Sequence, residues 1–168
     1  MNSNTTIKKI KIIESTGKIE IDCIRRGEQG EDEVKGLFAE QAAPEFYEAM
    51  KALTLPGANI LEAPELAPRL VPFAVTYHYD KDDTMGAIIT MKLKLPESKT
   101  ETVVNTPMRK CAKSDTPKGP VLTATAARAL WNLEAEARKY LTGKRAQKNL
   151  FEEDVTPKDE PEAIPQVV

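Results

Sequence analysis

Residues 71–79, VPFAVTYHY, and residues 86–95, GAIITMKLKL, decide the fold class. Both runs alternate between apolar and polar side chains, as strands do when one face is buried and the other is solvated. In the first run the side chains expected to face the core are Val71, Phe73, Val75, Tyr77 and Tyr79. In the second run they are Ile89, Met91, Leu93 and Leu95, and Lys92 and Lys94 take the opposite face. With the polar turn at 80–83 between them, the two runs predict an antiparallel hairpin.

The N-terminal region predicts a second hairpin. Residues 7–13 and 18–24 alternate around a Gly-containing turn, and Ile19, Ile21 and Cys23 share one face. We expect residues 25–33 to form a loop, followed by a short helix or irregular chain up to Ala43. Pro44 should open an amphipathic helix that Pro56-Gly57 ends.

The remaining segments complete the pattern. Pro-rich residues 56–72 are expected to form an irregular connector or one short turn of helix, and residues 100–105 a short fifth strand. A polar loop at 106–120 should lead into a long helix over 122–142, which Gly143 ends. The order ββαβββα predicts an α+β fold, with an antiparallel sheet of about five strands and two amphipathic helices packed on one face. We expect one domain over 1–151 and a disordered, acidic, Pro-rich tail over 152–168.

Composition excludes several classes of protein. The 168 residues are 40% hydrophobic and 30% charged, with a net charge of −2, which suits a globular chain. No run approaches a membrane span and no export signal is recognisable, so we expect a cytoplasmic protein with free thiols at Cys23 and Cys111. Residues 86–151 carry thirteen basic and five acidic residues, a net charge of +8. This stretch could follow a phosphate backbone through Lys92, Lys94, Lys144 and Arg145, or it could be an ordinary solvated surface.

Catalytic and cofactor motifs are not recognisable, so we expect a non-enzymatic protein with no cofactor and no metal site. The lone His78 is best explained as a strand histidine on the outer face, although it could act as a general base. Tyr77 and Tyr79 could stack on nucleic-acid bases, but their position among apolar residues favours the core. Trp131 lies off the main apolar stripe of its helix, where packing on the sheet is favoured over display to a partner.

The most specific motif follows the last helix. Residues 147–151, QKNLF, place an adjacent Leu-Phe pair among charged residues. The pattern Gln-x-x-Leu-Phe resembles the short peptide by which bacterial replication and repair proteins bind the sliding clamp. That resemblance assigns a hydrogen bond to Gln147 and an apolar pocket to Leu150 and Phe151, whereas Lys148 and Asn149 depart from the usual residues. The alternative is that the Leu-Phe pair packs on the first hairpin of its own domain as a C-terminal staple.

The wider chain is similar to a family of small uncharacterised proteins from phages, prophages and mobile elements. The resemblance covers residues 44–151 and is carried by PEFYEAMKAL, MGAIITMKLKL, the NTP at 105–107 and EAEARKYLTGKRAQKNLF. It implies a protein that acts during phage or element replication. We therefore expect an accessory protein of phage-type DNA replication or recombination that is tethered to the clamp or bound to another replication protein. The alternative is an inhibitor of a host defence system or host enzyme.

Overall fold

Seven strands and three α-helices make up residues 4–146, the part of the chain that the computed structural model describes. The elements are β1 Thr5–Ile13, β2 Lys18–Gly27, β3 Gly30–Phe38, α1 Pro44–Lys51, α2 Thr54–Ile60, the 3-10 helix η1 Pro64–Arg69, β4 Leu70–Tyr79, β5 Met85–Leu95, β6 Thr100–Asn105, β7 Arg109–Lys110 and α3 Ala124–Leu141. The strands form one antiparallel sheet in the order β3-β2-β1-β4-β5-β6, and β7 pairs with β5. The α+β class is confirmed, with seven strands where about five are predicted.

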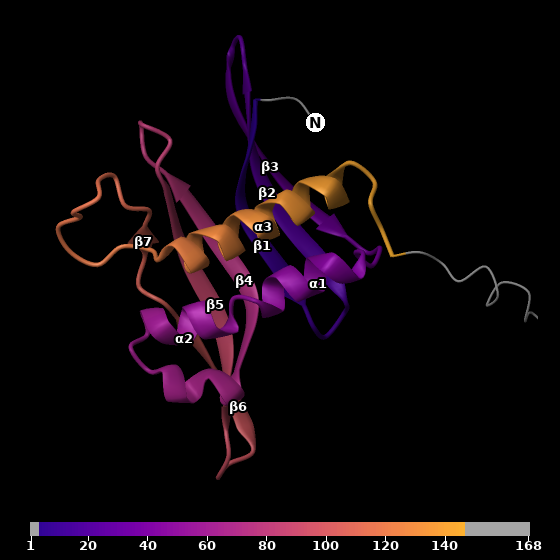
Figure 1. The fold of residues 1–168 in the computed structure, drawn as a ribbon. Coiled ribbons are helices and arrows are strands. Elements are labelled where there is room, and N and C mark those ends of the chain that lie inside the picture. Colours follow the sequence, from indigo (N-terminus) through magenta and orange to yellow (C-terminus); the bar gives the residue numbers. More distant parts are fainter. Residues whose placement is uncertain (1–3, 147–168) are drawn as a thin grey trace, which may run out of the picture.

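The helices lie together on one face of the sheet, with α3 running across the strands and α1 and α2 beside it (Figure 1). The core is the layer between them, and the predicted inward faces of β2 and β5 supply much of it. Ile19, Ile21, Cys23, Ile89 and Met91 are all buried. From the helices, the same layer receives Phe46, Ala49 and Met50 of α1 and Leu130, Leu133 and Tyr140 of α3.

The prediction for residues 25–38 is wrong, whereas residues 39–43 are irregular, one of the two predicted possibilities. Strand β2 continues to Gly27, and the chain turns at once into β3, which pairs with β2 along its whole length. The sequence GEDEVKGLF hides this strand because its acidic first half has a low strand propensity. At the edge of a sheet only one row of backbone groups is paired and most side chains meet water, so polar residues are tolerated there.

A β-bulge in β4 corrects the predicted inward face of this strand. The pairing of β4 with β5 shifts between Pro72 and Ala74, so Phe73 is an extra residue that reverses the alternation. Val75 and Tyr77 are buried as predicted, but Val71 is 42% exposed. Phe73 is half-buried and lies near Lys92, on the face away from the helices.

The predicted end of the first helix is also misplaced. Helix α1 ends at Lys51, and Pro56 and Gly57 lie inside the short helix α2. Pro56 is tolerated because it lies in the first turn, where backbone N–H groups have no helical partner. Gly57 is required by close packing, since a Cβ there would lie 2.6 Å from the Met91 sulfur of β5. The predicted irregular connector is therefore mostly helical, as α2 and η1.

The last helix is close to its prediction. Its N-cap is Thr123, whose hydroxyl accepts a hydrogen bond of 3.1 Å from the Ala126 backbone N–H. Gly143, with φ +114°, follows its end as expected. The packing expected for Trp131 is not found, because 49% of this side chain remains exposed on α3.

Candidate binding surfaces

Residues 144–146 are bound to the folded domain by side-chain and backbone contacts. The Lys144 ammonium lies 3.5 Å from Glu136 of α3 and 3.6 Å from Glu45 of α1. The Arg145 guanidinium stacks over the Tyr140 ring at 3.6 Å from its centre, and its Nε lies 3.1 Å from a Glu40 carboxylate oxygen.

The Ala146 backbone N–H then donates to the Gln41 carbonyl at 3.0 Å. The chain is thus fixed up to the residue before the Gln-x-x-Leu-Phe motif. The motif itself, with the candidate partner-binding residues Gln147, Leu150 and Phe151, lies outside the described residues.

The four basic residues predicted to contact nucleic acid do not form one surface. Lys144 and Arg145 engage side chains on the helical face of the sheet. Lys92 and Lys94 project from the opposite face of β5, because their neighbours Met91 and Leu93 pack with the core. The basic residues of this stretch of sequence therefore lie on two opposite faces of the sheet.

The positive charge of Lys92 is partly neutralised by neighbouring carboxylates. Its ammonium donates to the Glu14 carboxylate at 2.5 Å and lies 3.8 Å from Glu101. The hydrogen bond with Glu14 raises the pKa of Lys92, and the same contact lowers the pKa of Glu14. Lys94, two residues further along β5, is exposed. Of the two strand lysines, Lys94 is the more available to a phosphate.

Other cations of the basic stretch are held in ion pairs at the end of the β4–β5 hairpin. Asp80 receives the ammonium groups of Lys110 at 2.9 Å and Lys113 at 3.3 Å, and its pKa is lowered by the Lys110 hydrogen bond. Lys113 also lies 3.0 Å from Asp82 and, by hydrogen bonding, lowers the pKa of Asp82 to about 2. The formal charge of this stretch therefore overstates the positive field that a nucleic acid would meet.

The sheet face opposite the helices is not covered by any helix within residues 4–146 (Figure 1). It mixes charged side chains with exposed apolar ones, including Val71, Val103 and Leu37. Among the charged residues of this sheet face, Asp22 on β2 is unusual because it is buried. It is only 7% exposed, and its Oδ1 has no hydrogen-bond partner in the described structure. Desolvation, reinforced by Glu20, raises the pKa of Asp22. Sequence analysis missed this buried carboxylate, because in the alternating run 18–24 Asp22 takes a position that is expected to face water.

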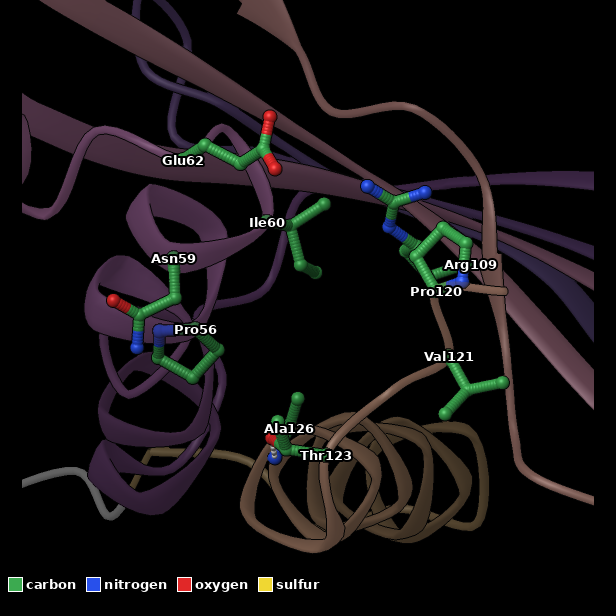
Figure 2. A pocket seen from close by; sticks show the side chains of 9 residues that line it. All are labelled: Pro56, Asn59, Ile60, Glu62, Arg109, Pro120, Val121, Thr123 and Ala126. Atoms are coloured by element: carbon green, nitrogen blue, oxygen red, sulfur yellow. Dashed lines mark hydrogen bonds between the residues drawn. The ribbon is translucent and has the colours of Figure 1, made fainter. Parts of the chain in front are cut away.

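A hollow of about 200 Å³ lies between α2 and the start of α3 (Figure 2). Figure 2 shows the Glu62 carboxylate and the Arg109 guanidinium extending toward it from opposite sides, with Ile60 between them. Thr123, whose hydroxyl caps α3, lines its lower wall. Glu62 adopts φ +58°, an uncommon conformation for a residue with a side chain. The hollow can offer one carboxylate and one guanidinium to a polar group, and no sequence pattern indicates that these two distant residues line one hollow.

The remaining candidate residues have structural surroundings. Tyr77 is buried and Tyr79 half-buried, which places neither as an open stacking platform, and the rings stack on each other with centres 6.5 Å apart. The His78 side chain is half exposed and lies 3.6 Å from Asp80. Cys23 and Cys111 are free thiols.

Among residues 4–146, no three His, Cys, Asp or Glu side chains gather as a metal site would require. No helix in the described part of the chain is both long and apolar enough to cross a membrane.

The chain was compared with protein families, curated proteins and solved structures. No family model, curated protein or solved structure matches the chain.

Proposed function

We propose that this protein is a non-enzymatic accessory protein of phage-type DNA replication or recombination, acting in the cytoplasm. In this proposal the folded domain contacts DNA or a replication protein, and the QKNLF segment tethers the domain to the bacterial sliding clamp. The resemblance of Gln147, Leu150 and Phe151 to clamp-binding peptides motivates the tether.

One structural observation supports this proposal above the others. Lys144, Arg145 and Ala146 are each bound to the domain, and the motif begins with the next residue. A peptide fused this closely to a fixed point reaches a partner without a long linker. Two apolar anchors in a short segment are a common basis for recognition by a hydrophobic pocket.

Direct binding to purified sliding clamp tests the tether. The full chain should bind immobilised clamp, and L150A/F151A should bind at least about 100-fold more weakly, since each anchor contributes roughly 1.5–3 kcal/mol on burial. The matched control is V167A/V168A, which removes two apolar side chains from the same tail and should leave the affinity unchanged. Failure of the full chain to bind clamp would remove the tether from the proposal.

A second candidate function is inhibition of a host defence system or host enzyme through surface complementarity. It is favoured by the uncovered sheet face, where Leu37 is 58% exposed and Val103 is 56% exposed among charged residues. Such mixed apolar and charged surfaces suit protein partners. If inhibition is the function, L37K/V103K should abolish the effect of the expressed protein on the host, and L150A/F151A should retain it. The opposite pattern would favour the clamp-bound accessory protein.

A further inference from the structure

An apolar trough lies beside α1, on the side of this helix that faces the end of β1. Its volume is about 400 Å³, and its walls come from α1, β1, η1 and the first residues of β4. The side chains that line it include Ile12, Tyr47, Met50, Ala67 and Leu70. Apolar surface of this kind gains free energy when a hydrophobic side chain displaces water from it.

The described chain ends near the start of α1, and two hydrogen bonds connect this point to one residue that lines the trough. The Ala146 N–H donates to the Gln41 carbonyl at 3.0 Å, and the N–H of the next residue, Ala42, donates to the Tyr47 hydroxyl at 3.2 Å. These two hydrogen bonds fall on the two sides of one peptide group, Gln41–Ala42. A hydrogen-bonded path thus runs from Ala146 through the Gln41–Ala42 peptide group to the hydroxyl of Tyr47, whose side chain lines the trough.

The length of chain that follows is sufficient to enter the trough. Leu150 and Phe151 lie four and five residues beyond Ala146. An extended chain covers about 3.3–3.6 Å per residue, so these residues can reach about 13–18 Å from Ala146. Helix α1 has eight residues and is about 12 Å long at 1.5 Å per residue. Both side chains can thus reach the end of the trough that Tyr47 lines.

We propose that Leu150 and Phe151 of the same chain occupy this trough. The charges at its rim fit the segment, since Lys51 lines the trough and Glu152, Glu153 and Asp154 follow the apolar pair. Within the described residues Lys51 has no ion-pair partner. A second apolar hollow, lined in part by Phe38 and Leu141, is smaller, about 220 Å³, and the Arg145 guanidinium lies 5.9 Å from the Phe38 ring centre.

This inference goes beyond the proposed function and holds whether or not the clamp is the partner. If both are correct, the trough and the clamp compete for one pair of side chains. Docking within the domain then lowers the apparent affinity for the clamp by the fraction of molecules in which the pair is free. The trough would hold the apolar pair out of water until a partner takes it.

Thermal unfolding of the full chain, with no clamp present, tests the inference. L150A/F151A should lower the Tm by several degrees, because about 1 kcal/mol shifts the Tm of a domain of this size by roughly 2–4 °C. V167A/V168A should leave the Tm unchanged. To locate the contact, Ile12→Ala is combined with L150A/F151A in a double-mutant cycle, and Ile60→Ala is the matched control. Both isoleucines are half-buried against the core, but Ile60 lines the hollow of Figure 2 and not the trough.

The expected result is that I12A lowers the Tm less in the L150A/F151A background than in the wild type, whereas I60A lowers it equally in both. An unchanged Tm for L150A/F151A would overturn the inference. So would additive effects of I12A, or coupling to I60A instead, since each places the apolar pair away from the trough. Because no clamp enters these measurements, their failure leaves the clamp-binding test undisturbed, and the reverse is also true.

Discussion

The hydroxyl of Tyr77 donates a hydrogen bond of 2.6 Å to the backbone carbonyl of Leu130. Tyr77 is 1% exposed on the central strand β4, and Leu130 is fully buried in the middle of α3. The bond joins the sheet to the helix that crosses it, and it satisfies the one polar atom of the Tyr77 side chain. It also explains why this tyrosine belongs to the core.

Tyr77→Phe should lower the stability of the domain. The substitution removes one buried hydrogen bond worth about 1 kcal/mol, and the Leu130 carbonyl keeps its bond within the helix. The expected decrease in Tm is about 2–4 °C by differential scanning calorimetry. Tyr79→Phe, on the same strand, is the control and should change the Tm less. An equal decrease for the two variants would show that the Leu130 bond contributes nothing of its own.

The two strand tyrosines also predict a loss of stability in alkali. Burial raises the pKa of Tyr79 to about 12 and raises that of Tyr77 well above its ordinary value. Because an unfolded tyrosine ionises near pH 10, the native state holds more protons above this pH. Stability from these groups is complete below about pH 10 and is lost as the pH rises through about 12.

Urea unfolding at about pH 9 and about pH 11 should show this loss, and Tyr79→Phe should reduce it. A phenolate absorbance titration of the folded protein should show the late ionisation directly. If the variant and the wild type lose equal stability between the two pH values, Tyr79 does not contribute to the alkaline effect.

Alternating sequence predicts the strands that have one buried face and one wet face. Ile19, Ile21 and Cys23, and likewise Ile89 and Met91, are buried as expected because burial selects side chains directly. The predictions fail where the backbone departs from regular geometry. The bulge at Phe73 reverses the alternation of β4 in space, but the polar and apolar residue types along the strand are those of a regular strand. The bulge therefore cannot be detected in the sequence.

The candidate surfaces were less predictable than the fold. Arg145 was expected to contact phosphate, but it stacks on Tyr140, a contact that depends on how α3 packs. The hollow in Figure 2 is lined by both Glu62 and Arg109, which are far apart in sequence and come to one place only through the packing of the folded chain. Long-range packing of this kind leaves no local pattern.

Asp22→Asn should stabilise the protein at neutral pH. The Asp22 carboxylate is buried on β2 with an unpaired oxygen, and desolvation raises its pKa. Its favourable contribution is therefore complete only below its unfolded pKa of about 3.9, and is lost as the pH rises through the folded value. The expected result is a Tm higher by up to a few degrees at pH 7, with a gain that shrinks toward pH 4. Asp32→Asn, at an exposed position on β3, is the control.

A lower Tm for Asp22→Asn at pH 7 would contradict this prediction. It would mean that the carboxylate is stabilised by a cation, for which Lys9 and Lys35 on the flanking strands are the nearest candidates in register.

Any nucleic-acid binding should depend on the outer-face lysines of β5. If the domain binds single-stranded or duplex DNA at low salt, K92Q/K94Q should reduce the slope of log affinity against log salt concentration by about one, chiefly through Lys94, because Lys92 is paired with Glu14. K144Q/R145Q should change the slope less, because these side chains are engaged with Glu136 and Tyr140. Fluorescence anisotropy across a salt series measures both. No binding at low ionic strength, or a larger effect of the second pair, would contradict this assignment.

Arg145 should hold the chain that leads to the QKNLF motif against the folded domain. Its guanidinium lies 3.6 Å from the centre of the Tyr140 ring and 5.9 Å from that of Phe38. A cation over an aromatic face contributes about 0.5–2 kcal/mol according to its exposure, so Arg145→Ala should lower the Tm by a few degrees. Arg145→Lys should recover only part of this loss, because an ammonium lacks the planar surface that stacks on a ring. Arg128→Ala, on the exposed side of α3, is the control.

The effect should also be visible locally. In native-state hydrogen exchange the Ala146 amide, which donates to the Gln41 carbonyl, should exchange faster in Arg145→Ala than in the wild type, whereas amides in the middle of α3 should change only with global stability. Unchanged exchange at Ala146 would show that its hydrogen bond, and not the stacked guanidinium, fixes the chain. Full recovery by lysine would show that charge alone, through Glu40, is sufficient.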